Sequence, residues 1–326
     1  MLLRIENLSS RSSMEVEKTF LFGNHVCMMN ENSRMLTFIE TTSLCFNEVN
    51  AHYHGIDWDL LLEGSAVVTY NGNPFIWTLN GMAVGNLEQN GFHWRIAPTT
   101  GPQPRFAKFL TTGVTNDDST TSYMVLCHDT TNHWIGLNSE PREYAFYLYE
   151  LNLQTLCWKR STIVGSNILK KYGWRFCENT MKLVAKQSKV HVFTKDGDPE
   201  HMIIDRISKR WALAKSRKCS DVMFIRAAFV VQDKLHTILN DRQRKMLMIY
   251  RHDEGSNTKL GERSNCSKAN LTLFDMSCSD VHVSGSCVYI IGTTSPINGA
   301  KYLQYLIVLS LSEYGSSVEL ANEEST

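Results

Sequence analysis

The amino-acid sequence predicts an all-β fold, a six-bladed β-propeller with four antiparallel strands in each blade. Three observations support this prediction. Apolar and polar residues alternate along most of the 326-residue chain, which is the period of a β-strand with one buried face. The apolar runs are short and numerous. A polar turn followed by an aromatic or apolar residue recurs about every 54 residues, and a blade of four short strands needs a unit of that size.

The individual strands are predicted from runs of β-branched and aromatic residues that are each about as long as one strand. Turn-forming residues separate them, such as Asn-Gly-Asn at 71–73 and Lys-Asp-Gly-Asp at 195–198. Only 55–64 and 166–174 resemble a helical turn or two. The apolar runs that mark strands are 19–23, 35–40, 65–70, 74–79, 122–128, 145–151, 189–194, 201–207, 227–231, 235–239, 246–250, 281–285, 287–292 and 305–309.

The recurring turn begins with a polar residue and ends six positions later with an aromatic one. An Asn or Asp at the start of such a turn can accept hydrogen bonds from the backbone just after it. The aromatic residue then begins the returning strand with a large side chain that can be buried. The three clearest pairs are Glu40 with Phe46, Asn152 with Trp158, and Asp205 with Trp211.

Three looser copies complete the series. Asn86 stands eight residues before Trp94, which indicates a turn with two added residues. The remaining copies replace the aromatic residue, and their pairs are Asp253 with Lys259 and Ser312 with Val318.

The segment after Trp94 resembles a kelch repeat. In that family a Trp is followed by Gly, Pro and Arg, which lead into the inner strand of the next blade. Trp94, Gly101, Pro104 and Arg105 occur in that order. The chain is therefore similar to a degenerate kelch-repeat propeller, in the superfamily that includes the central domain of galactose oxidase. Trp158 is followed by Gly165 and by Lys170 or Lys171 near the Arg position.

The resemblance covers residues 17–320 and departs from the family in one respect. The Gly-Gly doublet that usually ends the second strand of a kelch repeat is absent, and single glycines such as Gly23 and Gly292 stand near its place. We expect one propeller at 17–320, an N-terminal segment at 1–16 and a flexible tail at 321–326.

Two features of the ring stay open at this stage. Residues 2–7 could add an outer strand to the last blade, or 317–321 could complete that blade instead. Seven blades are the alternative if 50–64 and 259–280 contain further strands.

Composition argues against two classes of function. Lys plus Arg equals Asp plus Glu, 33 of each, and the pI is about 7.1, so no global charge attracts nucleic acid or anionic lipid. The basic run at 208–218 is interpreted as a solvated turn between strands. The N-terminus lacks the apolar stretch of a secretory signal, and no run has the length of a membrane span. We expect a cytoplasmic or nuclear protein.

The nine cysteines contain no Cys-x-x-Cys pair and no zinc spacing. Most of them, Cys45 and Cys157 included, lie in apolar, strand-like context. They are interpreted as buried free thiols that behave as small hydrophobic side chains.

Two His-containing clusters are candidates for metal sites. His52 and His54 would share one face of a strand, near Asp57 and Asp59, but no third ligand follows from the spacing. A polar loop between blades, with Trp58 packed inward, is the favoured interpretation. A second cluster with the same interpretation contains His128, Asp129 and His133.

No local catalytic or nucleotide-binding motif is present, so the sequence predicts neither an enzyme nor a cofactor. The alternative is a propeller enzyme with a metal or small-molecule site at the mouth of the channel, because some kelch-like proteins, such as copper radical oxidases, are enzymes.

The favoured function is a non-catalytic protein-interaction module, a scaffold or adaptor subunit that binds a protein through loops at one end of the ring. A substrate-recognition subunit of a ubiquitin ligase is a further alternative, although the 16 residues before the first unit leave no room for a BTB or F-box domain. The predicted partner-binding residues are Trp134, Arg142, His133, Tyr53, His54 and Trp58. The predicted structural anchors are Phe46, Trp94, Trp158, Trp211, Asn152, Asp205, Gly101 and Arg105.

Overall fold

The computed structural model of the chain contains twenty-four β-strands and one short α-helix within the residues that it describes. The all-β prediction is therefore confirmed. The described residues are 3–8, 16–30, 33–65, 67–78, 80–104, 114–115, 120–129, 144–163, 182–193, 200–215, 223–241, 246–253, 256–264, 277–294 and 303–311.

One sheet has eight strands and is built from the N-terminal part of the chain. Its spatial order is β2-β3-β4-β5-β9-β8-β7-β6. The helix α1 (Trp58–Glu63) connects β5 to β6. The strands are β2 (Val16–Phe22), β3 (His25–Asn30), β4 (Ser33–Glu40), β5 (Phe46–His54), β6 (Val68–Tyr70), β7 (Asn73–Thr78), β8 (Gly81–Glu88) and β9 (Gly91–Ala97).

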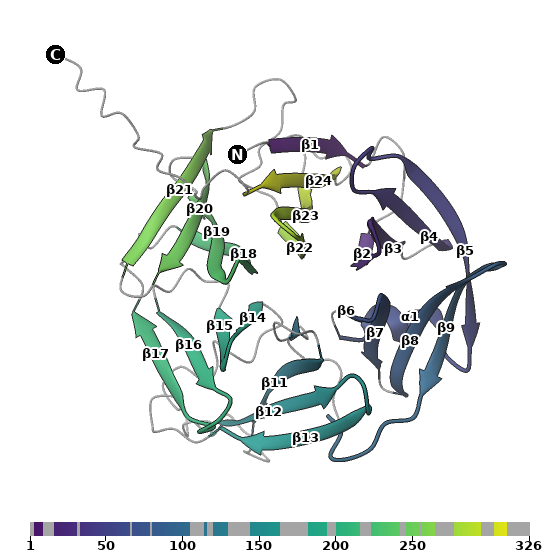
Figure 1. Ribbon diagram of the computed structural model, residues 1–326, viewed down its shortest axis with the longest axis horizontal. Helices are drawn as coiled ribbons and strands as arrows, with labels where there is room; N and C mark the ends of the chain where they lie inside the picture. The colour runs from purple at the N-terminus through teal and green to yellow at the C-terminus, as the bar shows by residue number, and fades with distance from the viewer. Residues whose placement is uncertain are drawn as a thin grey trace, which may run out of the picture.

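The eight-stranded sheet is joined at its middle by a parallel pair of strands. All its other neighbouring strands are antiparallel, whereas β5 and β9 run parallel from Ala51↔Phe92 to His54↔Arg95. The parallel pair unites two antiparallel halves of four strands each, at the strands that lie farthest from the centre in Figure 1.

Four further sheets have four strands each, and each of them is antiparallel throughout. The second to fourth sheets are β10 (Val114–Thr115), β11 (Thr121–Asp129), β12 (Tyr144–Asn152) and β13 (Cys157–Thr162); β14 (Lys182–Lys186), β15 (Lys189–Phe193), β16 (Glu200–Asp205) and β17 (Trp211–Lys215); and β18 (Met223–Val231), β19 (Lys234–Asp241), β20 (Met246–Asp253) and β21 (Ser256–Ser264). The last sheet contains β22 (Ser277–Ser284), β23 (Cys287–Thr294) and β24 (Leu303–Ser310), with β1 (Leu3–Asn7) outside β24.

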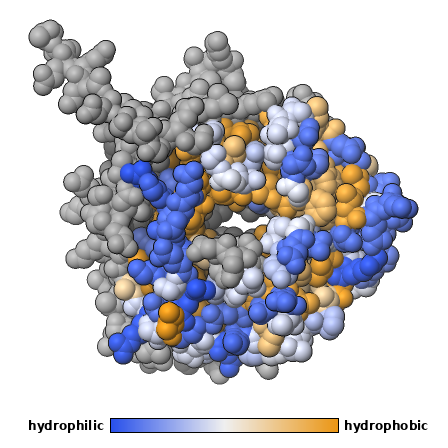
Figure 2. All heavy atoms as spheres, viewed as in Figure 1, coloured by the Kyte–Doolittle hydropathy of each residue, from blue (hydrophilic) through white to orange (hydrophobic). Residues whose placement is uncertain are grey.

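The sheets stand around a central axis and form a closed ring. Figure 1 shows them arranged radially, and Figure 2 shows an opening at the centre. The innermost strands contact one another in succession around the ring, in the order β2, β6, β10, β14, β18, β22 and back to β2. A closed ring leaves no first or last sheet with an unprotected face.

The N-terminal strand completes the last sheet. β1 pairs antiparallel with β24, from Leu3↔Leu309 to Asn7↔Tyr305, so the two ends of the chain share one sheet. The alternative strand at 317–321 lies outside the described residues.

The core lies between neighbouring sheets. Tyr123 and Leu148, for example, pack against Leu183, Val192 and other apolar residues of the next sheet. Each sheet therefore buries side chains on both faces, which explains why apolar residues are so frequent along single strands.

The recurring turn has one geometry in two of its predicted copies. Oδ1 of Asn152 accepts hydrogen bonds from the backbone N–H groups two and three residues later, at 3.0 and 2.8 Å. Oδ1 of Asp205 does the same at 3.0 and 2.7 Å. The hydrogen bonds from Ser208 hold the pKa of the Asp205 carboxyl below its ordinary value.

The fourth residue after each polar residue has a left-handed backbone. Leu44, Leu156 and Lys209 have φ angles of 57°, 51° and 56°. The shared polar start and left-handed fourth residue explain why the aromatic residue of the returning strand stands six positions after the polar residue.

The residues predicted as anchors occupy different depths. Trp94 and Trp158 are almost fully buried. Phe46 and Trp211 are half-buried against core clusters. Arg105 lies outside the described residues.

Gly101 holds a loop against Trp158. Its φ is +86°, and a Cβ there would lie 2.2 Å from the Trp158 carbonyl oxygen. The adjacent Thr100 carbonyl accepts the Trp158 N–H at 2.8 Å. Only glycine fits this close approach with that backbone conformation.

Two of the three looser turns differ from the prediction, and the third, Ser312 with Val318, lies outside the described residues. β8 and β9 pair up to Glu88↔Gly91, so a tight turn replaces the longer one expected before Trp94. Asp253 pairs with Ser256, and Lys259 therefore lies within β21 rather than at its start. In both places the cross-strand hydrogen bonds continue to the turn, which leaves no room for a six-residue connection.

The cysteine prediction is correct for Cys27 and wrong for Cys45. Burial raises the pKa of the Cys27 thiol far above its ordinary value, which keeps it protonated. Cys45 is exposed because it lies in the turn before β5.

Candidate functional site

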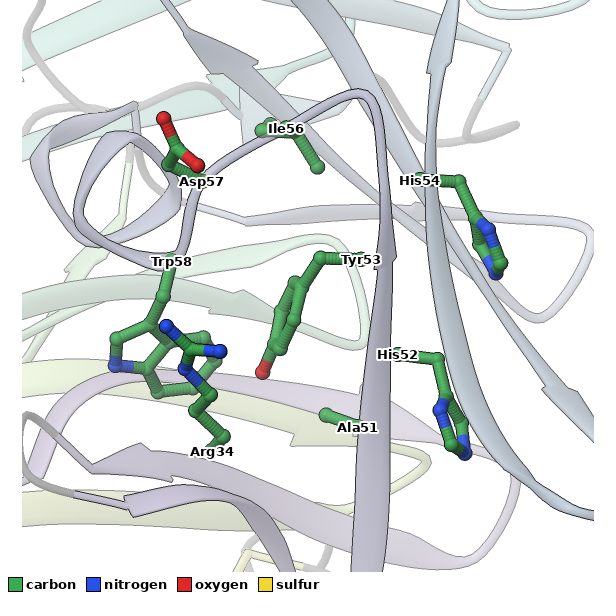
Figure 3. Close-up of a pocket in the computed structure, with 8 residues that line it drawn as sticks. All are labelled: Arg34, Ala51, His52, Tyr53, His54, Ile56, Asp57 and Trp58. Carbon is green, nitrogen blue, oxygen red and sulfur yellow. The ribbon is translucent and has the colours of Figure 1, made fainter.

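A pocket of about 410 Å³ lies where β5 ends and α1 begins. It sits at the connection between the two halves of the eight-stranded sheet, and we refer to it as the β5–α1 pocket (Figure 3). Its lining residues are Arg34, Ala51, His52, Tyr53, His54, Ile56, Asp57 and Trp58.

The alternation of β5 directs its side chains to opposite sides. Tyr53 points to the side where Arg34 and Trp58 lie, whereas His52 and His54 point away from them (Figure 3). Successive residues of a strand face opposite ways, so one strand supplies both a pocket wall and a separate His cluster.

Tyr53 is the central wall of the pocket. Its ring meets the Trp58 ring edge-on, with centroids 5.3 Å apart and planes at 67°. Its hydroxyl is buried and has no hydrogen-bond partner among the described residues. Burial raises the pKa of the Tyr53 phenol above its usual range and the Arg34 charge offsets part of this rise, so the hydroxyl stays protonated at neutral pH.

Trp58 is held by the short helix that it begins. Its side chain is buried in the same apolar cluster as Leu61. The helix ends at Gly64, where a Cβ would lie 2.6 Å from an Ile76 methyl and 2.7 Å from the Trp77 carbonyl oxygen. The Gly64 carbonyl accepts a hydrogen bond from Lys18 Nζ at 2.7 Å. These contacts hold the end of α1 against β7 and β2, and α1 carries Trp58.

Arg34 comes from the start of β4 and lies beside the Tyr53 hydroxyl (Figure 3). The side chain is exposed, and among the described residues it makes no hydrogen bond or ion pair. Asp57, the other charged residue of the wall, is exposed and makes no side-chain bond to the start of α1. The pocket therefore offers a guanidinium whose hydrogen-bonding groups are unused by the described part of the chain.

The other face of β5 carries a hydrogen-bonded His cluster. His54 Nε2 lies 2.8 Å from His93 Nδ1, and His93 Nε2 lies 2.7 Å from Asn90 Oδ1. His52 Nε2 lies 3.0 Å from the Asn90 backbone oxygen. Both Asn90 oxygens can only accept, so His52 and His93 each donate from Nε2. His93 Nδ1 then accepts from His54, which places the proton on Nε2 of all three neutral rings.

The His cluster depends on the parallel pairing of β5 with β9, which brings His93 next to His52. The rings of His52 and His54 stack on His93, with centroids 4.6 and 5.1 Å away. Desolvation lowers the pKa of His93 below its ordinary value, and Glu88 offsets part of that shift.

No metal site is formed by the residues that the structure describes. Among them, no three His, Cys, Asp or Glu side chains come together in a way that could hold an ion. His93 supplies the third imidazole that the sequence spacing did not identify, but the three rings are hydrogen-bonded and stacked instead of converging on one point.

The structure brings together half of the predicted partner-binding residues. Tyr53, His54 and Trp58 all line the β5–α1 pocket, with His54 turned away from the other two. Trp134, Arg142 and His133 lie outside the described residues. His128 and Asp129 end β11, and their side chains are not described.

Sequence reasoning missed Arg34, His93 and Asn90. Arg34 reaches the pocket because β4 pairs antiparallel with β5, and the pair Met35↔Asn50 places Arg34 on the side of Ala51. The pairing of neighbouring strands could have revealed it. His93 and Asn90 arrive through the parallel β5–β9 pair, for which no local signal exists.

Known structures match this fold over nearly its full length, with little sequence identity. A luciferin-regenerating enzyme matches with a TM-score of 0.55 and 9% identity over 95% of this chain and 96% of that one. The protein YjhT matches with a TM-score of 0.56 and 12% identity over 92% and 96%. A β-propeller domain of Cps50 (Swd1) from Myceliophthora thermophila matches more weakly, at a TM-score of 0.45 and 8% identity over 89% and 82%. No protein-family model and no curated protein sequence matches the chain.

The closed ring of radial sheets is a β-propeller, as predicted. Within the described residues, no helix has the length and apolar character that crossing a membrane requires.

The expectation that the chain is not an enzyme is contradicted by the same comparison. A luciferin-regenerating enzyme has this fold over 95% of the chain at 9% identity. The expectation rested on the absence of local catalytic motifs. A ring of sheets can assemble a site from residues far apart in the sequence, so no such motif is required.

Proposed function

We propose that the protein is a six-bladed propeller that recognises a protein partner through the β5–α1 pocket. Each four-stranded sheet corresponds to one blade, and the eight-stranded sheet corresponds to two blades joined by the β5–β9 pair. In this proposal residues 1–16 supply the closing strand, 17–320 form the ring and 321–326 form a tail.

The kelch type belongs to the same proposal. Gly101 follows Trp94 in the order of the kelch pattern, and its backbone lies against Trp158 of the next sheet. Pro104 is buried just beyond it. This geometry supports a kelch-like connection between the second and third blades.

The observation that carries the proposal is the unused hydroxyl of Tyr53. A buried hydroxyl without a partner lowers stability, because folding removes its hydrogen bonds to water. Such a group calls for a physical explanation, and a ligand bound beside it is one. The exposed Arg34 and the buried Trp58 beside it are residue types enriched where protein partners bind tightly.

The place of the pocket in the ring supports a recognition role. The pocket is formed where the chain leaves one four-stranded half of the sheet and enters the other. Connections between strands vary more readily than the strands they join, and binding residues are frequent in them. A cytoplasmic or nuclear location stays a prediction.

Site-specific photo-crosslinking tests this proposal. A photoreactive residue replaces Asp57 at the rim of the pocket, or Ile207, which is 82% exposed on another sheet, as a control. We expect one partner to crosslink from position 57 and not from 207. The same crosslink should disappear in Ala51→Met, which fills the pocket.

The melting temperature of Ala51→Met must match that of the parent protein for this result to count. A crosslink from position 57 that survives in a folded Ala51→Met protein would refute the pocket as the binding site.

A further inference from the structure

We infer that the β5–α1 pocket binds a carboxylate of its partner, carried by an acidic side chain next to an apolar residue. This inference rests on the proposed function and names the chemistry that the pocket selects.

The polar groups around the Tyr53 hydroxyl are hydrogen-bond donors. Arg34 presents N–H groups and no acceptor. The Tyr53 hydroxyl is protonated, lies beside the guanidinium and donates to no described residue. Its accessible area is below 1 Å², so a ligand reaches it only when a neighbouring side chain moves aside. A ligand group that satisfies both must accept hydrogen bonds and gains most if it is negatively charged.

The pocket wall carries one positive and one negative side chain at separate places. Arg34 and Asp57 lie apart on the pocket wall, and the Tyr53 ring lies to one side of both (Figure 3). The histidines of β5 point away from this side. An anion is therefore attracted to Arg34 and repelled from Asp57, which fixes the direction in which an acidic group enters.

The pocket also contains apolar residues that an apolar part of the ligand would contact. Ala51, Ile56 and Trp58 line the same pocket, but Ile56 and Trp58 are each only 6% exposed, so they offer a ligand a small apolar contact beside the donors. Around 410 Å³ holds one side chain together with part of a neighbouring residue. An acidic residue beside an apolar one satisfies both the donors and this apolar wall.

The forked guanidinium favours a planar group with two equivalent oxygens, which a carboxylate provides. A phosphate has the same acceptor chemistry and carries more charge. Phosphorylated and carboxylate ligands are therefore compared directly in the test.

The test titrates the purified full-length chain with three capped peptides, acetyl-Leu-Glu-Leu-amide, its Gln counterpart and its phosphoserine counterpart. Binding is followed by NMR at millimolar peptide concentrations. We expect the Glu peptide to bind roughly 10- to 100-fold more tightly than the Gln peptide, because a hydrogen-bonded charge is lost.

Two variants and one control locate the binding. Arg34→Gln should weaken binding of the Glu peptide by about tenfold or more, and Tyr53→Phe by about three- to tenfold. Arg160→Gln is the matched control, because Arg160 is also exposed and lies over a tyrosine, with its guanidinium carbon 5.3 Å from the Tyr147 ring centroid, but does not line the pocket. It should leave the affinity unchanged.

Equal binding of the Glu and Gln peptides, or no binding of any peptide, would overturn the inference. The phosphoserine peptide could instead bind about tenfold more tightly than the Glu peptide, in a way that depends on Arg34. That result would overturn the carboxylate as the ligand in favour of a phosphate. The crosslink from position 57 is scored separately. If that crosslink forms but the peptides do not bind, the pocket remains the proposed binding site and only the carboxylate as its ligand is refuted.

Discussion

Replacing Tyr53 by Phe should make the protein more stable. The Tyr53 hydroxyl has an accessible area below 1 Å² and no hydrogen-bond partner among the described residues. Leaving such a group buried costs about 1–3 kcal/mol, and deleting it relieves that cost. The ring stays in place in the variant, so its edge-on contact with Trp58 at 5.3 Å is kept.

The expected gain is about 1 kcal/mol in the free energy of unfolding, near the lower end of that range because Tyr53 as a whole is only half-buried. In a chain of 326 residues this corresponds to a rise in melting temperature of about 2 °C. Urea denaturation should show a higher midpoint with an unchanged slope.

Tyr289→Phe is the matched control for this measurement. Tyr289 is 5% exposed, and its hydroxyl is hydrogen-bonded to Thr41. Removing that hydroxyl should lower stability by about 1 kcal/mol. If Tyr53→Phe destabilises the protein as much as Tyr289→Phe does, the Tyr53 hydroxyl has a partner and the reasoning about the pocket is refuted.

Three further predictions test the fold and the His cluster. Gly101→Ala should lower the free energy of unfolding, measured by urea denaturation, by at least about 1 kcal/mol more than Gly55→Ala does. Both glycines have a positive φ, but only Gly101 lies against backbone atoms. Equal effects of the two substitutions would contradict the close approach of Gly101 to Trp158. Trp158→Ala should cost about 3–5 kcal/mol in unfolding free energy, and an unchanged melting temperature would show that Trp158 is no anchor. Stability should fall as pH drops below 6.5, because the lowered pKa of His93 means that the unfolded chain binds more protons there than the folded chain. Between pH 7.5 and 5.5, urea denaturation should show a smaller loss of unfolding free energy for His93→Gln than for the parent protein. An equal loss would show that His93 is not the source of the pH dependence.

The strands and the ring were predictable because they follow from local patterns. Alternation of apolar residues marks a strand wherever one face is buried, and Asn152 and Asp205 form the turns that their spacing suggests. The copy at Asp253 failed because a tight turn and a longer one can follow the same polar residue. The sequence does not show where cross-strand pairing stops.

The candidate site was only half predictable. Tyr53 and Trp58 are five residues apart, and their aromatic character marked the segment as unusual. Arg34 and His93 join it through pairing between strands, and the β5–β9 pair is parallel in a sheet that is otherwise antiparallel. Pairing of this kind depends on how two halves of the sheet meet, which alternation along one strand does not encode.

Hydrogen–deuterium exchange of the full-length chain, with and without the partner captured from position 57, tests the central claim most directly. We expect the increase in amide protection on partner binding to be concentrated at 33–36 and 51–63, the segments that build the β5–α1 pocket. Protection confined to the 131–143 segment or to the 205–211 turn, with 51–63 unchanged, would contradict it.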